Sequence, residues 1–168
     1  SLDNLASAVA NEGGIGVIGT AGIGMMVGGN RRNFEQASIE GLKRIIRNAR
    51  EKTNGILGVN IMVALTNYKD MVTTAIKEKI DVIISGAGLP LDLPSFLSEG
   101  SKTRLIPIVS SLRSAQLIFR RWLKRHNYIP DAFVVEGPKA GGHLGYRPEQ
   151  LDDPESSLER TIPQIRDF

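Results

Sequence analysis

Five short and almost continuously apolar segments recur along this chain, and a helical pattern separates each from the next. The five segments are Ile15–Ile18, Leu57–Val63, Asp81–Ser85, Arg104–Ser110 and Ala132–Val135. Strands without polar alternation are typical of parallel sheets, because helices cover both of their faces. The order and spacing therefore predict an α/β fold, built either as an open doubly wound sheet or as a (β/α)8 barrel.

The helical segments carry apolar residues at intervals of three and four. They are Ser1–Asn11, Asn33–Lys52, Met71–Ile80, a helix that follows Ser111, and Ser157–Phe168, with a short helix at Leu93–Glu99. Asn33 and Gln36 form a capping-box pattern, and Ser111 is a second candidate N-cap. We expect Gly19–Asn30 to be a glycine-rich loop. Pro107 lacks an amide hydrogen, so we expect imperfect pairing in its strand.

The composition fits one globular domain, residues 1–168, and narrows its chemistry. Of the 168 residues, 41% are hydrophobic and 23% charged, which is ordinary for a domain with its own core. A net charge of +3 is too mild to argue for nucleic acid. The chain has no Cys and only two His, so disulfides, thiolate chemistry and a metal site are not expected. No apolar run approaches the roughly 18 residues of a membrane span, so we expect a cytoplasmic protein. We also expect its partner to be a small molecule, and the sequence leaves the oligomeric state open.

Two overlapping glycine patterns lie near the N-terminus, and they differ in how well their position suits a ligand site. Gly14–Gly19 spells GxGxxG, but its apolar letters are themselves the expected strand and a helix precedes it. A dinucleotide fingerprint must instead lie between a strand and the helix that follows. Gly19–Gly24 is better placed, because it follows the strand, where glycines let backbone amides approach a flavin or a phosphate. The alternative is a mobile loop.

The stretch Asp131–Gly145, DAFVVEGPKAGGHLG, is the best candidate for a site. An apolar strand ends on Glu136, and a glycine-rich turn then carries His143. A strand that ends in such a turn suits a ligand site at the open end of an α/β sheet. His143 titrates near neutral pH and can move a proton to or from carbon. The alternative is a tight turn with a surface His.

Two further polar residues have both a structural and a functional interpretation. Asn60 lies within an apolar strand, where its amide either pairs with neighbouring structure or bonds a heterocyclic cofactor. Glu136 either orients a partner or bonds a cofactor ring, or it forms a simple salt bridge. The sequence alone does not decide between these interpretations.

Four motifs then resemble one known family and follow its order along essentially the whole chain. They are LASAVANEGGIGVIG (5–19), GVNIM (58–62), SGAG (85–88) and VVEGPKAGGHLG (134–145). They resemble the nitronate monooxygenases, formerly called 2-nitropropane dioxygenases, which are FMN-dependent (β/α)8 barrels. The family also contains a flavin-dependent enoyl-acyl-carrier-protein reductase that shares the last motif.

The resemblance implies a partial (β/α)8 TIM barrel that holds strands 2 to 6 of 8 and is truncated at both ends. Five strands cannot close the cylinder, so we expect this segment alone to bind FMN weakly or not at all. The resemblance makes His143 the catalytic histidine and Asn60 a flavin-contacting amide. It implies that further residues line the cofactor site: Gly19, Thr20, Gly86, Glu136, Gly137, Gly141 and Gly142.

The leading function is then FMN-dependent oxidation of alkyl nitronates or nitroalkanes by dioxygen, with His143 taking the α-proton of a neutral nitroalkane. One alternative is an enoyl-acyl-carrier-protein reductase that uses NAD(P)H, in which Arg31 and Arg32 would meet the acidic carrier. A third is a non-catalytic flavin- or phosphate-binding module, and a fourth is a fragment that acts only through its open edges.

Overall fold

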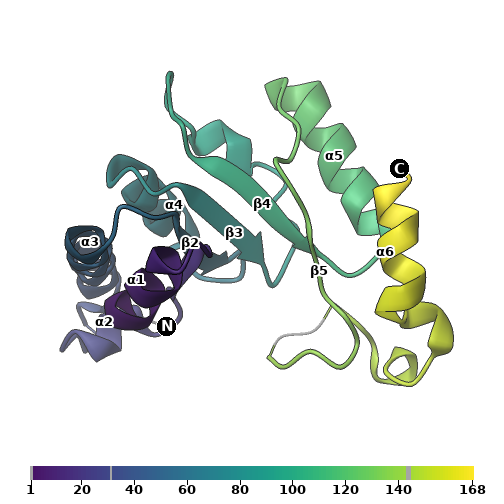
Figure 1. Cartoon of the computed structure of the whole chain (residues 1–168), viewed down its shortest axis with the longest axis horizontal. Helices are drawn as coiled ribbons and strands as arrows, with labels where there is room; N and C mark the ends of the chain where they lie inside the picture. Colours follow the sequence, from purple (N-terminus) through teal and green to yellow (C-terminus); the bar gives the residue numbers. More distant parts are fainter. Residues whose placement is uncertain (1, 31, 143–144) are drawn as a thin grey trace.

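The computed structural model describes residues 2–30, 32–142 and 145–168. Within them lies one all-parallel, five-stranded sheet whose spatial order, β1-β2-β3-β4-β5, is the order of the chain. The strands are β1 (Gly16–Gly19), β2 (Leu57–Met62), β3 (Val82–Gly86), β4 (Arg104–Val109) and β5 (Val134–Val135). Doubly wound sheets reverse direction at a switch point, and this one does not. The sheet curls instead into part of a (β/α) barrel (Figure 1).

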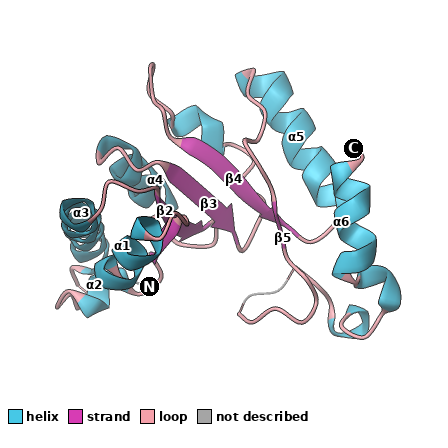
Figure 2. Ribbon diagram, in the orientation of Figure 1, coloured by secondary structure: helices cyan, strands magenta, loops and turns pink. Residues whose placement is uncertain are grey.

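Helices follow the strands and cover the outer side of the curled sheet (Figure 2). They are α1 (Asp3–Asn11), α2 (Ile23–Met26), α3 (Phe34–Lys52), α4 (Tyr68–Lys77), α5 (Leu112–His126) and α6 (Leu158–Arg166), with 3-10 turns at Leu93–Phe96, Pro148–Gln150 and Pro154–Ser156. None of the helices among the described residues is long and apolar enough to cross a membrane.

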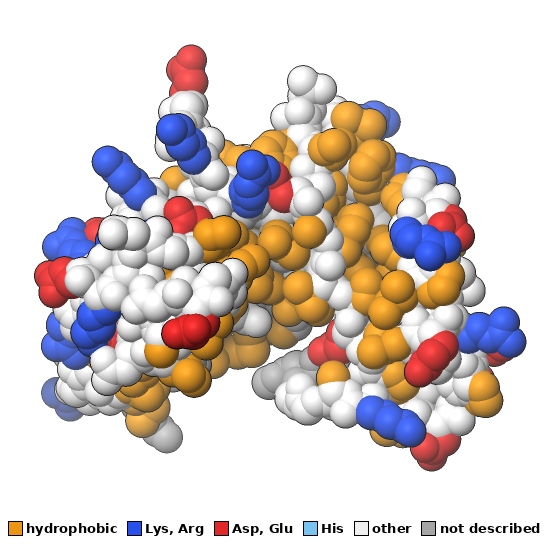
Figure 3. Space-filling view, in the orientation of Figure 1, with side chains coloured by type: hydrophobic (Ala, Val, Ile, Leu, Met, Phe, Trp, Pro, Cys, Tyr) orange, Lys and Arg blue, Asp and Glu red, His pale blue; other side chains and the backbone are white. Residues whose placement is uncertain are grey.

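The two faces of the sheet differ in burial. In β2, Leu57, Val59 and Ile61 are fully buried and belong to the core shared with the helices. Side chains alternate along a strand, so Asn60 and Met62 lie on the opposite, concave face, where both are only half-buried. Figure 3 shows hydrophobic side chains along the hollow between the two lobes of the molecule. The concave face is therefore the accessible inner surface of the partial barrel.

Pro107 explains why β5 has two residues instead of the four expected. Leu105 directs its backbone groups toward the last strand, since its carbonyl accepts from the Asp131 amide at 3.1 Å. Alternate residues of a strand direct their backbone groups the same way, so Pro107 presents its missing donor to that neighbour. Pairing resumes only at Ile108 with Val134 and Val109 with Val135. The expected imperfection is confirmed and falls on one side of β4.

Three local predictions needed correction. The expected loop Gly19–Asn30 contains the short helix α2, and the expected helix Leu93–Glu99 is a 3-10 turn that ends at Phe96. Asn33 does not cap α3, because its Oδ1 accepts from the Asn30 amide at 2.6 Å in the preceding turn. By contrast, Ser111 caps α5 as expected, by accepting from the Ser114 amide at 3.3 Å.

Aspartates fix the beginnings of two strands in the same way. Asp81 precedes β3, and its carboxylate accepts from the Leu57 amide at 2.8 Å and from Arg50 at 2.6 Å. Asp131 precedes β5 and accepts from the amide of Leu105 at 2.8 Å. Tyr128 and Arg104 complete that second cluster, at 2.5 and 2.8 Å. Burial acts to raise the pKa of Asp131, but these three hydrogen bonds together hold it below its usual value.

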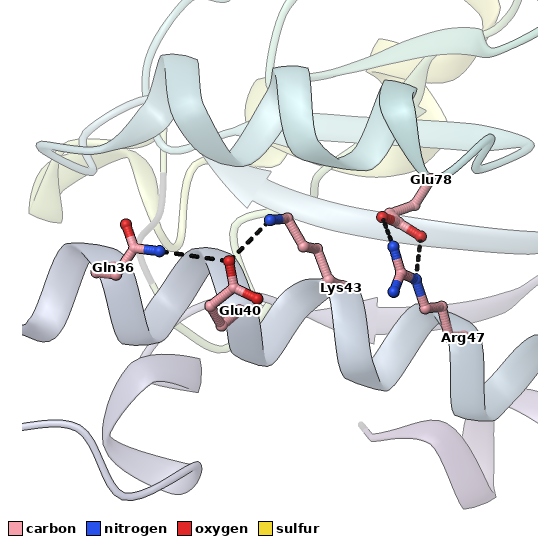
Figure 4. A network of polar contacts seen from close by, with 5 residues as sticks. All are labelled: Gln36, Glu40, Lys43, Arg47 and Glu78. Atoms are coloured by element: carbon pink, nitrogen blue, oxygen red, sulfur yellow. Dashed lines mark hydrogen bonds and ion pairs between the residues drawn. The ribbon is translucent and has the colours of Figure 1, made fainter.

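The adjacent helices α3 and α4 are joined by charged side chains on their outer surface (Figure 4). Arg47 binds both carboxylate oxygens of Glu78, each at 2.7 Å. Two turns earlier on α3, Glu40 accepts from Lys43 at 2.7 Å and from Gln36 at 3.3 Å. Of these contacts, only the Arg47–Glu78 pair joins α3 to the end of α4, because the others lie within α3.

Candidate functional site

The C-terminal ends of the five parallel strands lie at one edge of the sheet, and every predicted site residue that the structure describes is at this edge. At β1 and β2, Gly19 lies in register with Asn60. Thr20 is buried and uses both its amide and its hydroxyl to bind the Asn60 carbonyl, at 3.2 and 2.8 Å. The Asn60 backbone is therefore fixed, while its side-chain amide forms no hydrogen bond with any described residue.

Gly86, the last residue of β3, lies between the ends of β1 and β2 on one side and those of β4 and β5 on the other. Its partner in register is Met62. A Cβ at this position would lie 2.8 Å from the Cβ of Ile108, so Gly86 allows close packing on the concave face. The next residue, Ala87, has a positive φ of 51°, as does Gly88 at 131°. The chain thus turns sharply away from the strand and leaves the edge open.

At β4 and β5, the glycine-rich turn is tied back onto the strand ends. The Gly145 amide donates to Glu136 Oε2 at 3.0 Å, and the Ser110 hydroxyl donates to the Gly145 carbonyl at 3.1 Å. The Tyr146 hydroxyl lies 3.0 Å from the Ser110 carbonyl and 2.7 Å from the Glu136 carbonyl. Burial, and next the charge of Glu136, raise the pKa of Tyr146. Its hydroxyl therefore stays protonated and serves as a donor.

A cavity of about 430 Å³ opens beside this turn. It is lined by Ala64, Ala87, Gly88, Leu89, Ile108, Val109, Ser110, Ser114, Glu136 and Gly145. A second cavity of about 600 Å³ lies on the other side of Glu136, toward α6, and includes Lys139. Glu136 therefore stands between two hollows at the end of β5. Another cavity of similar size, beside Lys77 and Lys102, lies at the opposite end of the strands and contains no predicted site residue.

The glycines of the turn have different surroundings. A Cβ at Gly137 would lie 2.9 Å from Leu158, so this glycine lets α6 pack closely. At Gly141 and Gly142, no described atom outside the adjacent residues lies within 4 Å of the place that a Cβ would take, and Gly142 has a φ of 92° that favours glycine. The predicted catalytic residue His143 lies outside the described residues. The structure thus brings Glu136 together with the returning end of the turn and leaves Gly141 and Gly142 free to face a ligand.

Sequence reasoning missed Ser110 and Tyr146. Tyr146 lies just outside the last motif, and Ser110 is the last residue of the expected strand Arg104–Ser110. A serine at the end of an apolar strand is only a weak signal of a functional site. Tyr146 gave none, because its two partners lie 10 and 36 residues earlier in the chain.

The strand order and the curled sheet define a partial (β/α) barrel. Its open C-terminal edge, with the glycine-rich turn, is the end at which such folds bind their ligands. The family model for nitronate monooxygenase matches residues 34–168. The chain therefore belongs to the nitronate monooxygenase family, a family of flavin oxidoreductases. None of the curated proteins matches it significantly.

Solved structures give the same fold. The chain is 27% identical to FabK from Thermotoga maritima in its M276A form, with a TM-score of 0.71 over 98% of this chain and 45% of that one. Unmutated FabK from the same organism is 30% identical over 86% of this chain and 40% of that one, with a TM-score of 0.64. A nitroalkane oxidase from Streptomyces ansochromogenes is 18% identical, with a TM-score of 0.74 over 99% and 52%. The chain spans about half the length of these proteins.

Proposed function

We propose that the whole protein is an FMN-dependent oxidoreductase that oxidises alkyl nitronates or nitroalkanes with dioxygen in the cytoplasm. The observation that carries the proposal is the C-terminal edge of the sheet. There an amide on the concave face that no described residue bonds, Asn60, shares the edge with an exposed glycine turn next to Glu136. Membership of the family supports the class of chemistry, and the nitronate substrate rests on the resemblance of the four motifs, in their order along the chain, to the nitronate monooxygenases.

The residues at this edge fit a flavin. Asn60 offers an amide that can both donate and accept, and no described residue uses it. Gly141 and Gly142 add no side chains beside the turn, so backbone groups there are open to a ligand. Gly19 and Thr20 hold the Asn60 backbone in place. When bound, FMN supplies the redox step, because it takes electrons from the substrate and passes them to dioxygen.

The remaining chemistry belongs to the chain. His143 is the proposed base, since an imidazole can take the α-proton of a neutral nitroalkane near neutral pH. Glu136 fixes the returning end of the turn that carries His143, through its bond to the Gly145 amide. A preformed nitronate has already lost this proton and does not need the base. Neutral nitroalkanes and nitronates therefore place different demands on the turn.

A second candidate is an enoyl-acyl-carrier-protein reductase in which NAD(P)H reduces the flavin. It is retained because the two FabK structures are 27% and 30% identical to this chain, whereas the nitroalkane oxidase is 18% identical. Arg32 is exposed near the start of α3 and is a candidate contact for an acidic carrier protein. Arg31 lies outside the described residues.

One experiment separates the candidates. The full-length protein is purified, its visible spectrum is recorded for flavin, and it is mixed without oxygen with ethylnitronate or with NADH. Bleaching of the flavin by ethylnitronate and not by NADH is the expected result. Bleaching by NADH alone would favour the reductase, and a colourless protein that takes up no FMN would exclude both.

A further inference from the structure

Tyr146 joins the ends of two strands that are otherwise barely paired. Ser110 follows β4 and Glu136 follows β5, and the Tyr146 hydroxyl reaches the backbone carbonyls of both. Pro107 lacks the amide donor that would extend their backbone pairing toward the start of the strands, so β4 and β5 share only two residue pairs. The single hydroxyl hydrogen is therefore shared between two carbonyls at the point where the sheet is least held by its own backbone bonds.

The same contacts hold the returning end of the glycine-rich turn. Gly145 is bound at its amide by Glu136 and at its carbonyl by Ser110. A Cβ on Gly145 would lie 2.6 Å from the Ser110 hydroxyl oxygen, so the backbone is packed closely there. Ser110, Glu136 and Gly145 also line the cavity of about 430 Å³ at this edge. The group Ser110, Glu136, Gly145 and Tyr146 is called the turn clamp below.

We propose that Tyr146 is a positioning residue of the flavin site, which sets the glycine-rich turn against the ends of β4 and β5 through the turn clamp. This inference rests on the proposed function. Tyr146 acts through the backbones of Ser110 and Glu136 and touches no reacting atom. Removal of its hydroxyl releases the turn, and a base carried on that turn loses its alignment with the proton that it takes. Displacement of a catalytic group by about 1 Å can lower a rate by roughly a hundredfold.

The test compares Tyr146→Phe with wild type and with Tyr128→Phe in the full-length protein. Phenylalanine keeps the ring and removes only the hydroxyl. Tyr128 is the matched control, because its hydroxyl binds Asp131 at the opposite end of the strands. Hydrogen exchange is first followed in the flavin-free protein, so that this readout does not depend on activity. We expect exchange in residues 137–147 to be at least about fivefold faster in Tyr146→Phe, as loss of one hydrogen bond predicts, and unchanged there in Tyr128→Phe.

The second readout is the ratio of kcat/KM for a neutral nitroalkane to kcat/KM for its nitronate. We expect this ratio to fall about tenfold or more in Tyr146→Phe and to stay constant in Tyr128→Phe. An unchanged exchange rate, or an equal loss on both substrates, would overturn the positioning role. The wild-type protein tests the proposed function separately: if it is reduced by NADH and not by nitronate, that function fails. In that case the bleaching of the flavin by NADH is compared in the two proteins. If Tyr146→Phe is bleached as fast as wild type, the positioning role is overturned as well.

Discussion

At the residue scale, two linked hydroxyls, those of Tyr68 and Ser85, tie the first turn of α4 to the sheet. Ser85 is fully buried, and its hydroxyl donates to the Ile61 carbonyl at 3.0 Å. Its single hydrogen is thereby used, so Tyr68 must be the donor in the 2.9 Å contact between the two hydroxyls. Burial raises the pKa of Tyr68 to about 12, although the bond to Ser85 acts in the opposite direction.

The raised pKa of Tyr68 predicts a loss of stability at alkaline pH. Between the ordinary value of 10.0 and about 12, the unfolded chain releases this proton and the folded chain keeps it. The contribution of Tyr68 to stability is therefore complete below pH 10 and is lost as pH rises through this window. The free energy of unfolding of the wild-type protein should fall between about pH 8 and about pH 11. In Tyr68→Phe we expect this fall to be smaller by roughly 1 kcal/mol. Urea unfolding at about pH 8 and about pH 11 measures it, and equal falls in both proteins would contradict the assignment.

At the element scale, the strands are fixed at both ends by groups that are not part of the ladder. Asp131 holds the beginning of β5 against β4, while the turn clamp holds its end. Between them Pro107 leaves the ladder incomplete. The position of β5 therefore depends on side chains more than on backbone pairing, and the glycine-rich turn is held by the turn clamp at the end of the strand.

Replacement of Asp131 tests this dependence. Asp131→Ala removes the acceptor of the Leu105 amide and of the Tyr128 hydroxyl, and it leaves a partly buried amide without its partner. We expect the free energy of unfolding to fall by about 1–3 kcal/mol. Arg104→Ala is the control, because the Arg104 side chain is 69% exposed, and its loss should cost less than about 1 kcal/mol. Urea unfolding compares the two, and equal effects would show that the ion pair, not the amide bond, holds the strand.

The elements were predictable from the sequence wherever the pattern was local. The apolar runs gave all five strands, and the serine cap of α5 was correct, because each depends on residues within a few positions. The extent of β5 was not, since it depends on a proline 25 residues or more before it in the neighbouring strand. The same reason hid Tyr146, whose partners come from two other elements.

At the scale of the whole molecule, the periodicity allowed two topologies, and only the spatial order of the strands separates them. That order brings Gly19, Asn60, Gly86 and Glu136 to one edge, while their role in holding a flavin stays a prediction from the resemblance. It also leaves β1 and β5 as the two outer strands of the described sheet. We propose that further β/α units complete the barrel in the whole protein, and we expect the isolated segment to bind FMN weakly for this reason.

On the proposed function, the concave face at the C-terminal edge of the sheet binds flavin through Asn60. The most direct test measures the Kd of FMN for the full-length protein and for its Asn60→Ala variant by quenching of flavin fluorescence. Asn54→Ala is the matched control, because Asn54 is exposed just before the start of β2. We expect Asn60→Ala to raise the Kd about tenfold or more, as loss of a ligand hydrogen bond predicts, and to change the free energy of unfolding by less than about 1 kcal/mol. An unchanged Kd in Asn60→Ala would show that flavin is not held by this amide.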